Sequence, residues 1–99
     1  RNWIGRSVGA RVRFTVIADS AAVEAALLDS AVAIRQLGAQ EALYREGLKS
    51  LVEVEGARTR AQSVAARVAS ARGTLAKSRA ELENATLEVR TVAAEYAGR

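Results

Sequence analysis

The hydrophobic and polar positions divide this chain into three stretches, and the first alternates. In residues 8–17, VGARVRFTVI, every second residue is apolar until Ile17 breaks the pattern. A period of two is typical of a β-strand, where successive side chains point to opposite faces. We therefore predict one N-terminal β-strand within a basic segment of residues 1–18. With Trp3 just outside it, the strand fits a membrane-spanning barrel or the sheet of a soluble domain equally well, and in both cases it needs neighbouring strands.

The second stretch predicts a helix from about residue 20 to residue 46. Asp19 or Ser20 can cap its start. Apolar residues then recur at steps of three or four, which is the spacing of one helix face: Val23, Leu27, Ile34, Leu37 and Tyr44. Gly47 stands where a helix C-cap glycine is expected. At 1.5 Å per residue this helix would be about 40 Å long.

A turn over residues 47–50 leads into the third stretch. Ser50 and Glu53 have the Ser-x-x-Glu spacing of a capping box, so a long helix is predicted over about residues 51–97. With Val54 as position a of a heptad, all a and d positions are apolar except Ser78: Val54, Ala57, Ala61, Val64, Val68, Ala71, Leu75, Leu82, Ala85, Val89, Val92 and Tyr96. A seven-residue repeat of this length predicts a left-handed supercoil against another helix.

The predicted fold class is therefore mainly α: a long antiparallel α-hairpin or coiled coil over residues 19–99, preceded by one β-strand. The long helix would reach roughly 70 Å, against about 40 Å for the first. We expect about half of the heptad seam to be covered either by another chain or by sequence that is missing here.

Composition and charge also favour assembly. A chain of 99 residues forms one domain with a thin core, and Ala and Val dominate its apolar residues. The net charge of +4 lies entirely in the first thirteen residues. In the long helix, residues 58–79 carry basic groups without acids, and residues 81–95 carry four Glu and one Arg. This polarity fits either a docking surface for an acidic partner or a solvated face.

Catalysis has little support in the sequence. The chain has no His and no Cys, so the usual general base, the thiolate nucleophile and most transition-metal ligands are missing. The carboxylate pairs Glu53/Glu55 and Glu81/Glu83 are two residues apart and diverge on a helix. We predict no enzyme activity and no catalytic, cofactor or metal site.

The turn carries a resemblance to a known family. Residues 44–58, YREGLKSLVEVEGAR, resemble the recurrent motif of the outer-membrane efflux proteins, the TolC-like channels, in which an aromatic-x-x-Gly turn leads into a long returning helix. The resemblance implies a homo-oligomer, by analogy a trimer, in the bacterial cell envelope. It also implies transport through an efflux or secretion conduit, and outer-membrane contact through the N-terminal strand. That family's chain is several times longer, so the resemblance implies an abbreviated or partial relative.

The α-hairpin of periplasmic adaptor proteins, the membrane fusion family, is the second resemblance. Ser50, Glu53, Glu55 and Ala57 are compatible with the start of its returning helix, and residues 80–86, AELENAT, are similar to its end. Two other hypotheses stay open. One is a soluble coiled-coil module that binds a partner helical protein. The other is a nucleic-acid-binding basic helix, against which count the spread of its charges around the helix and the absence of interleaved aromatic residues.

Overall fold

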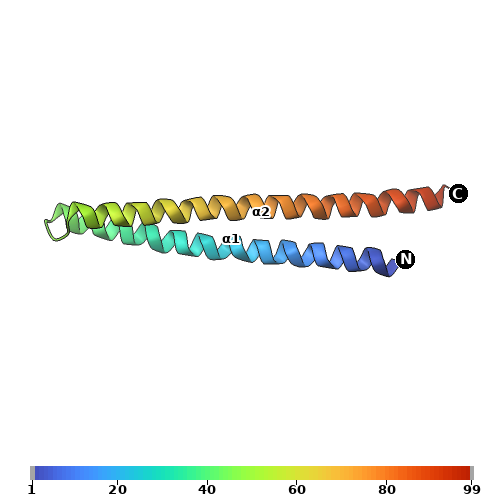
Figure 1. The fold of residues 1–99 in the computed structure, drawn as a ribbon, viewed down its shortest axis with the longest axis horizontal. Coiled ribbons are helices and arrows are strands. Elements are labelled where there is room, and N and C mark those ends of the chain that lie inside the picture. Colours follow the sequence, from blue (N-terminus) through green and yellow to red (C-terminus); the bar gives the residue numbers. More distant parts are fainter. Residues whose placement is uncertain (1, 99) are drawn as a thin grey trace.

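The protein is a helical hairpin in a computed structural model, which describes the backbone of residues 2–98 and the side chains of residues 8–98. Helix α1, Asn2–Arg45, and helix α2, Leu51–Ala97, run antiparallel and meet at a short turn (Figure 1). The rod measures 79 × 18 × 14 Å, and its radius of gyration is 22.2 Å. A compact domain of this length would have a radius of gyration of about 13 Å. The predicted helical hairpin is confirmed.

The predicted N-terminal β-strand is wrong, because residues 8–17 lie inside α1. The same residues also fit the four-residue spacing of a helix face. Val12 and Val16, four residues apart, are half-buried toward α2, whereas Phe14 between them is 71% exposed. Thr15 donates a hydrogen bond from Oγ1 to the Arg11 carbonyl at 3.0 Å, a bond that threonine often makes within a helix. A helix satisfies its backbone within the segment, whereas a lone strand would leave its backbone groups unpaired.

The two helices are nearly equal in length, which corrects the expectation of a lopsided hairpin. α1 has 44 residues and α2 has 47, since α1 starts at Asn2 and continues through Asp19 and Ser20, which were predicted to cap it. Most of the α2 seam that was expected to need another chain therefore lies beside α1 of the same chain.

The turn begins with a glycine in the left-handed region. Gly47 has φ +77°, and the Leu48 and Gly47 amides donate to the carbonyls of Leu43 and Tyr44, both at 2.9 Å. These two bonds are the Schellman pattern, which satisfies the last carbonyls of a helix and lets the chain reverse. Gly47 therefore fixes where α1 ends.

Candidate functional site

The seam of α2 faces α1 over most of its length. Val54, Val64, Val68, Leu75 and Ser78 are buried, with Val54 only 2% exposed. Ala57, Ala61 and Ala71, which lie between these buried positions, are half-buried. Leu82 and Ala85, which follow Ser78, are also half-buried. This part of the seam is consumed by contact within the chain, so it is not a free docking surface.

α1 contributes a matching heptad that the sequence reading missed. Ten of its buried and half-buried positions recur at alternating steps of three and four: Gly9, Val12, Val16, Asp19, Val23, Ala26, Ser30, Ala33, Leu37 and Gln40. Ala26 and Ala33 are the most buried of these. Among the described residues of α1, only Ser20, Glu41 and Leu43 are half-buried and lie off this repeat. Polar residues and a glycine interrupt the apolar pattern, which is why the repeat is hard to see. A search for a seven-residue repeat that starts at Gly9, instead of a search for apolar residues alone, would have identified this heptad.

Polar side chains also lie inside the seam, among them Ser78 on α2 and Gln40 on α1. Ser78 is buried and donates its hydroxyl to the Leu75 carbonyl at 3.0 Å, so its polar group is satisfied within its own helix. The Oε1 atom of Gln40 is buried and has no hydrogen-bond partner. An unsatisfied buried acceptor costs about 1 to 3 kcal/mol. The two helices are therefore held by a narrow, partly polar seam.

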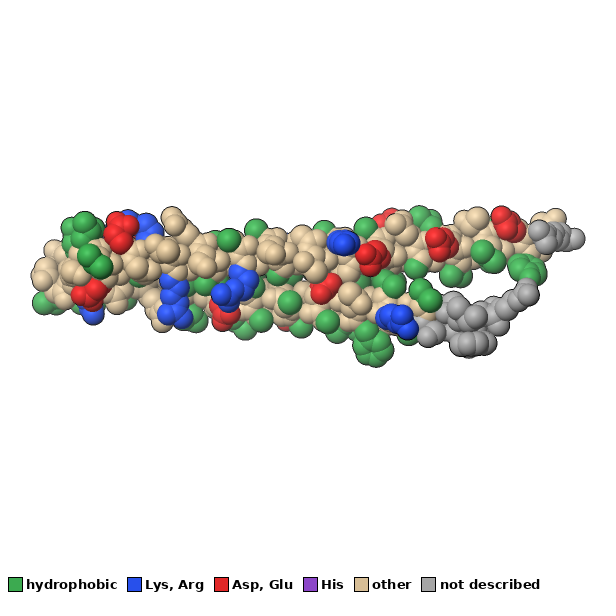
Figure 2. Space-filling view, in the orientation of Figure 1, with side chains coloured by type: hydrophobic (Ala, Val, Ile, Leu, Met, Phe, Trp, Pro, Cys, Tyr) green, Lys and Arg blue, Asp and Glu red, His purple; other side chains and the backbone are tan. Residues whose placement is uncertain are grey.

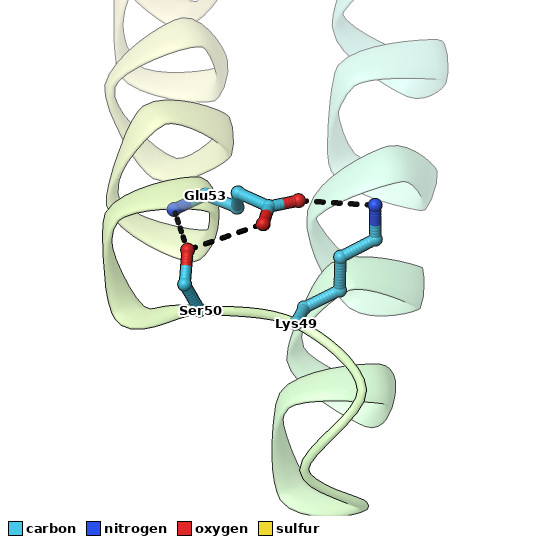
Figure 3. A network of polar contacts seen from close by, with 3 residues as sticks. All are labelled: Lys49, Ser50 and Glu53. Carbon is cyan, nitrogen blue, oxygen red and sulfur yellow. Dashed lines mark hydrogen bonds and ion pairs between the residues drawn. The ribbon is translucent and has the colours of Figure 1, made fainter.

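Lys49 and Ser50 of the turn form a small polar network with Glu53 in the first turn of α2 (Figure 3). Ser50 is the N-cap residue, and its Oγ accepts a hydrogen bond from the Glu53 amide at 3.2 Å. The Glu53 carboxylate accepts from the Ser50 hydroxyl at 3.2 Å and pairs with Lys49 Nζ at 3.0 Å. Hydrogen bonds from Lys49 and Ser50, together with the Lys49 charge, lower the pKa of Glu53 below its ordinary value. The network fixes the first turn of α2 and shows no arrangement for binding or catalysis.

Two ion pairs between the helices define which residues lie at the same level along the rod. Arg67 pairs with Asp29 at 3.6 Å, and Arg58 pairs with Glu41 at 3.9 Å. All four side chains are well exposed, so these pairs add little stability. They place the acidic stretch of α1, residues 19–29, beside residues 67–79, the second half of the basic stretch of α2.

Each helix also carries a stripe on the side turned away from the other helix. The outer stripe of α1 comprises exposed, mainly apolar positions: Phe14, Ala18, Ala21, Ala25, Leu28 and Val32. The outer stripe of α2 comprises exposed small positions: Gly56, Thr59, Ser63, Ala66, Ser70 and Gly73. Within these bounds neither stripe contains a charged residue, and the same faces end at Arg11 and Arg35 on α1 and reach Lys77 on α2. Figure 2 shows hydrophobic side chains scattered along the rod among charged and other side chains.

The seam of α2 is uncovered beyond Ala85. Val89, Val92 and Tyr96 are 60%, 53% and 69% exposed, and the ribbons of the two helices separate toward this end (Figure 1). A shallow hollow here is lined by Asn84, Leu87, Glu88, Thr91 and Val92. All five residues belong to one helix, so this hollow does not enclose a ligand.

Among the described residues, no group of three or more His, Cys, Asp or Glu side chains could hold a metal ion. Within the same part of the chain, neither helix combines the length and the apolar character needed to cross a membrane. Comparisons of the chain with protein-family models, with curated proteins and with solved structures give no match.

Proposed function

We propose that the protein is a non-enzymatic structural component that works by assembling its hairpin with other helices. The observation that carries this proposal is the exposed area. The chain exposes 7655 Å², whereas a compact monomer of its mass, 10.5 kDa, exposes about 5,400 Å². The excess of about 2,200 Å² exceeds the roughly 1,600 Å² that a standard protein interface buries in total. Assembly is the direct way to remove this surface from water.

The small hydrophobic core also supports assembly with other helices. The buried apolar side chains within residues 8–98 are two alanines, three valines and one leucine. Each helix uses one narrow face for its partner in the chain and leaves large apolar side chains, such as Phe14 and Leu28, on the surface. Exposed apolar surface of this extent is typical of interaction sites.

The proposed setting is an envelope efflux or secretion conduit, and it rests on the resemblance of residues 44–58. The helical form of residues 8–17 removes the predicted membrane strand, so the proposal keeps only the hairpin. Two helices of matched length joined by a capped turn suit a wall segment of a channel-like assembly. They also suit the adaptor-type hairpin that was the second resemblance.

A coiled-coil interaction module is the second candidate function, and one observation favours it. The end of α2 continues the heptad with Val89, Val92 and Tyr96, which α1 leaves exposed. A helix from another protein that continues the seam would cover these positions.

Light-scattering mass of the purified chain, measured over a range of concentrations in buffer and then in detergent, tests the proposal. We expect a defined multiple of 10.5 kDa with high helical content. A helical monomer at every concentration, with and without detergent, would contradict self-assembly. For the setting, we expect a tagged copy in the source cells to fractionate with the envelope. Recovery in the cytosolic fraction alone would contradict it.

A further inference from the structure

The outer stripes are unusual in their lack of charge. On a two-helix hairpin, the side farthest from the partner helix is normally the most polar and charged. Here the charged residues lie mainly beside the stripes. On α1 the nearest are Glu24 and Asp29, and on α2 they include Arg60 and Arg67, one position to the side of the stripe. The pattern places a short uncharged stretch on the back of each helix, over residues 14–32 of α1 and residues 56–73 of α2.

Two glycines in the outer stripe of α2 have no explanation within one hairpin. Gly56 and Gly73 lie in the helix interior, where glycine costs about 1 kcal/mol relative to alanine. A Cβ atom built at either position meets no heavy atom within 4 Å, so nothing in the chain requires their small size. Glycine at a helix surface allows another helix to approach closely. Both glycines, like Gly9 and Gly38 on α1, therefore have room beside them, and in the stripe of α2 this room is open to a neighbour from outside the chain.

We propose that the outer stripe of α1 of one copy packs against the outer stripe of α2 of a second copy, with the two hairpins side by side and pointing the same way. This inference rests on the proposed function and names its partner and surface. At the level set by the Asp29–Arg67 pair, the overlapping parts of the two stripes differ in size: Leu28 and Val32 project from α1, whereas Ala66, Ser70 and Gly73 line α2. Large side chains of one helix then fill the space left by small ones of the other.

The distribution of charge along the rod favours packing of α1 against α2 of the second copy over packing of α1 against α1 or of α2 against α2. Between Arg13 and Arg35, α1 carries only acids, and residues 58–79 of α2 carry only bases. The Asp29–Arg67 pair puts these stretches at one level. When a second copy lies alongside at the same height, the acidic stretch of α1 meets the bases from Arg67 to Arg79 of α2. Pairing α1 with α1, or α2 with α2, at that height would bring like charges together.

The pairing uses different surfaces on the two copies, so each copy still offers one free stripe after the first contact. Such heterologous interfaces continue until they close into a ring or extend as an open chain. Assembly by this route therefore goes beyond a dimer.

Cross-linking tests the pairing directly, because the native chain has no cysteine. Leu28 and Ser70 lie at nearly the same level on opposite outer sides of the rod, so thiols placed there cannot be joined within one hairpin. In the Leu28→Cys/Ser70→Cys variant, a short thiol-specific cross-linker should give a ladder of dimers, trimers and larger species. The control variant Leu28→Cys/Ala65→Cys moves the second thiol to the side of α2 and should give little product. Equal ladders from both variants, or efficient dimers from Leu28→Cys alone, would overturn the inference.

A second variant keeps the test independent of cysteine chemistry. Gly73→Leu adds bulk at a position that is open within the hairpin, so helical content should be unchanged or higher. Assembly should weaken by about tenfold or more, as expected when a close-packed contact is lost. Ala65→Leu is the matched control, with the same bulk off the stripe and unchanged assembly. An oligomeric wild-type chain whose mass Gly73→Leu leaves intact would overturn this pairing alone. A monomeric wild-type chain would overturn the proposed function and the pairing with it.

Discussion

The turn end and the open end of the rod have the same heptad spacing but different packing. Near the turn, Val54 and Ala33 are 2% and 3% exposed. At the open end, Val89 continues the α2 heptad but is 60% exposed, and the inner positions Gly9 and Val12 of α1 are only half-buried. The turn end is held by the Gly47 reversal, the Ser50 cap and two interhelical ion pairs. The comparison teaches that a heptad pattern predicts which face a residue occupies, whereas local restraints decide whether that face is covered.

The largest expected effect comes from charging the covered seam. In Val68→Asp/Leu75→Asp, two buried side chains become carboxylates without partners, and truncating a buried Leu alone costs about 2 to 5 kcal/mol. We expect loss of the helical hairpin, measured by circular dichroism and thermal unfolding. The matched control Val89→Asp/Val92→Asp places the same charges on the exposed end of the seam and should retain the helices. Equal unfolding in both variants would refute the difference between the two ends.

A smaller effect is expected from Gly47→Ala at the reversal. Because Gly47 has φ +77°, an alanine there would be strained by about 1 to 2 kcal/mol. The thermal midpoint should fall. Gly73→Ala is the control with the opposite sign, since Gly73 lies in an ordinary helical conformation and alanine should stabilise it. The idea fails if both variants shift the midpoint in the same direction.

Removing the N-cap should have a further, more modest effect. Ser50→Ala deletes the acceptor of the Glu53 amide and should cost about 1 kcal/mol. Ser50→Asp retains an acceptor and should keep most of the stability. Hydrogen exchange of the first-turn amides of α2 gives a local readout, and unchanged exchange in Ser50→Ala would contradict the role of the cap.

The smallest expected effect is the pH dependence of the turn. The pKa of Glu53 is lowered in the folded hairpin, so its contribution is fully present above the ordinary value of 4.5. It is lost as the pH falls through the folded pKa. The thermal midpoint of Glu53→Gln should therefore show a shallower acid dependence than that of the wild type. Parallel curves for the two proteins would contradict this role of the carboxylate.

The sequence predicted the hairpin because its strongest signals are local. A glycine at position 47 followed by a serine at position 50 indicates a helix end and the start of the next helix. The heptad repeat from Val54 is long and mostly apolar, so it indicates that the second helix packs against another helix. The start of α1 was mispredicted because ten alternating residues satisfy both periods, and the polar Asp19 in the inner heptad resembled a cap. The deciding factor is that the described part of the chain, residues 2–98, offers no other strand with which residues 8–17 could pair.

The candidate surfaces were harder to predict than the fold. The heptad reading followed apolar residues, so it identified the seam that α1 covers and overlooked the outer stripes. Their signal is the absence of charge at positions such as Ala21 and Ser63, combined with glycines that nothing in the hairpin requires. This signal becomes visible only when both helices are placed and their outer sides can be compared.

Sedimentation equilibrium of the wild-type chain beside Leu28→Lys tests the central claim most directly. Leu28 is 69% exposed in the single hairpin, so the substitution should leave helical content unchanged. The account predicts an assembly of several 10.5 kDa copies for the wild type and a shift of about tenfold or more toward the monomer for Leu28→Lys. A wild-type monomer at every concentration, or identical assembly of the two proteins, would contradict it.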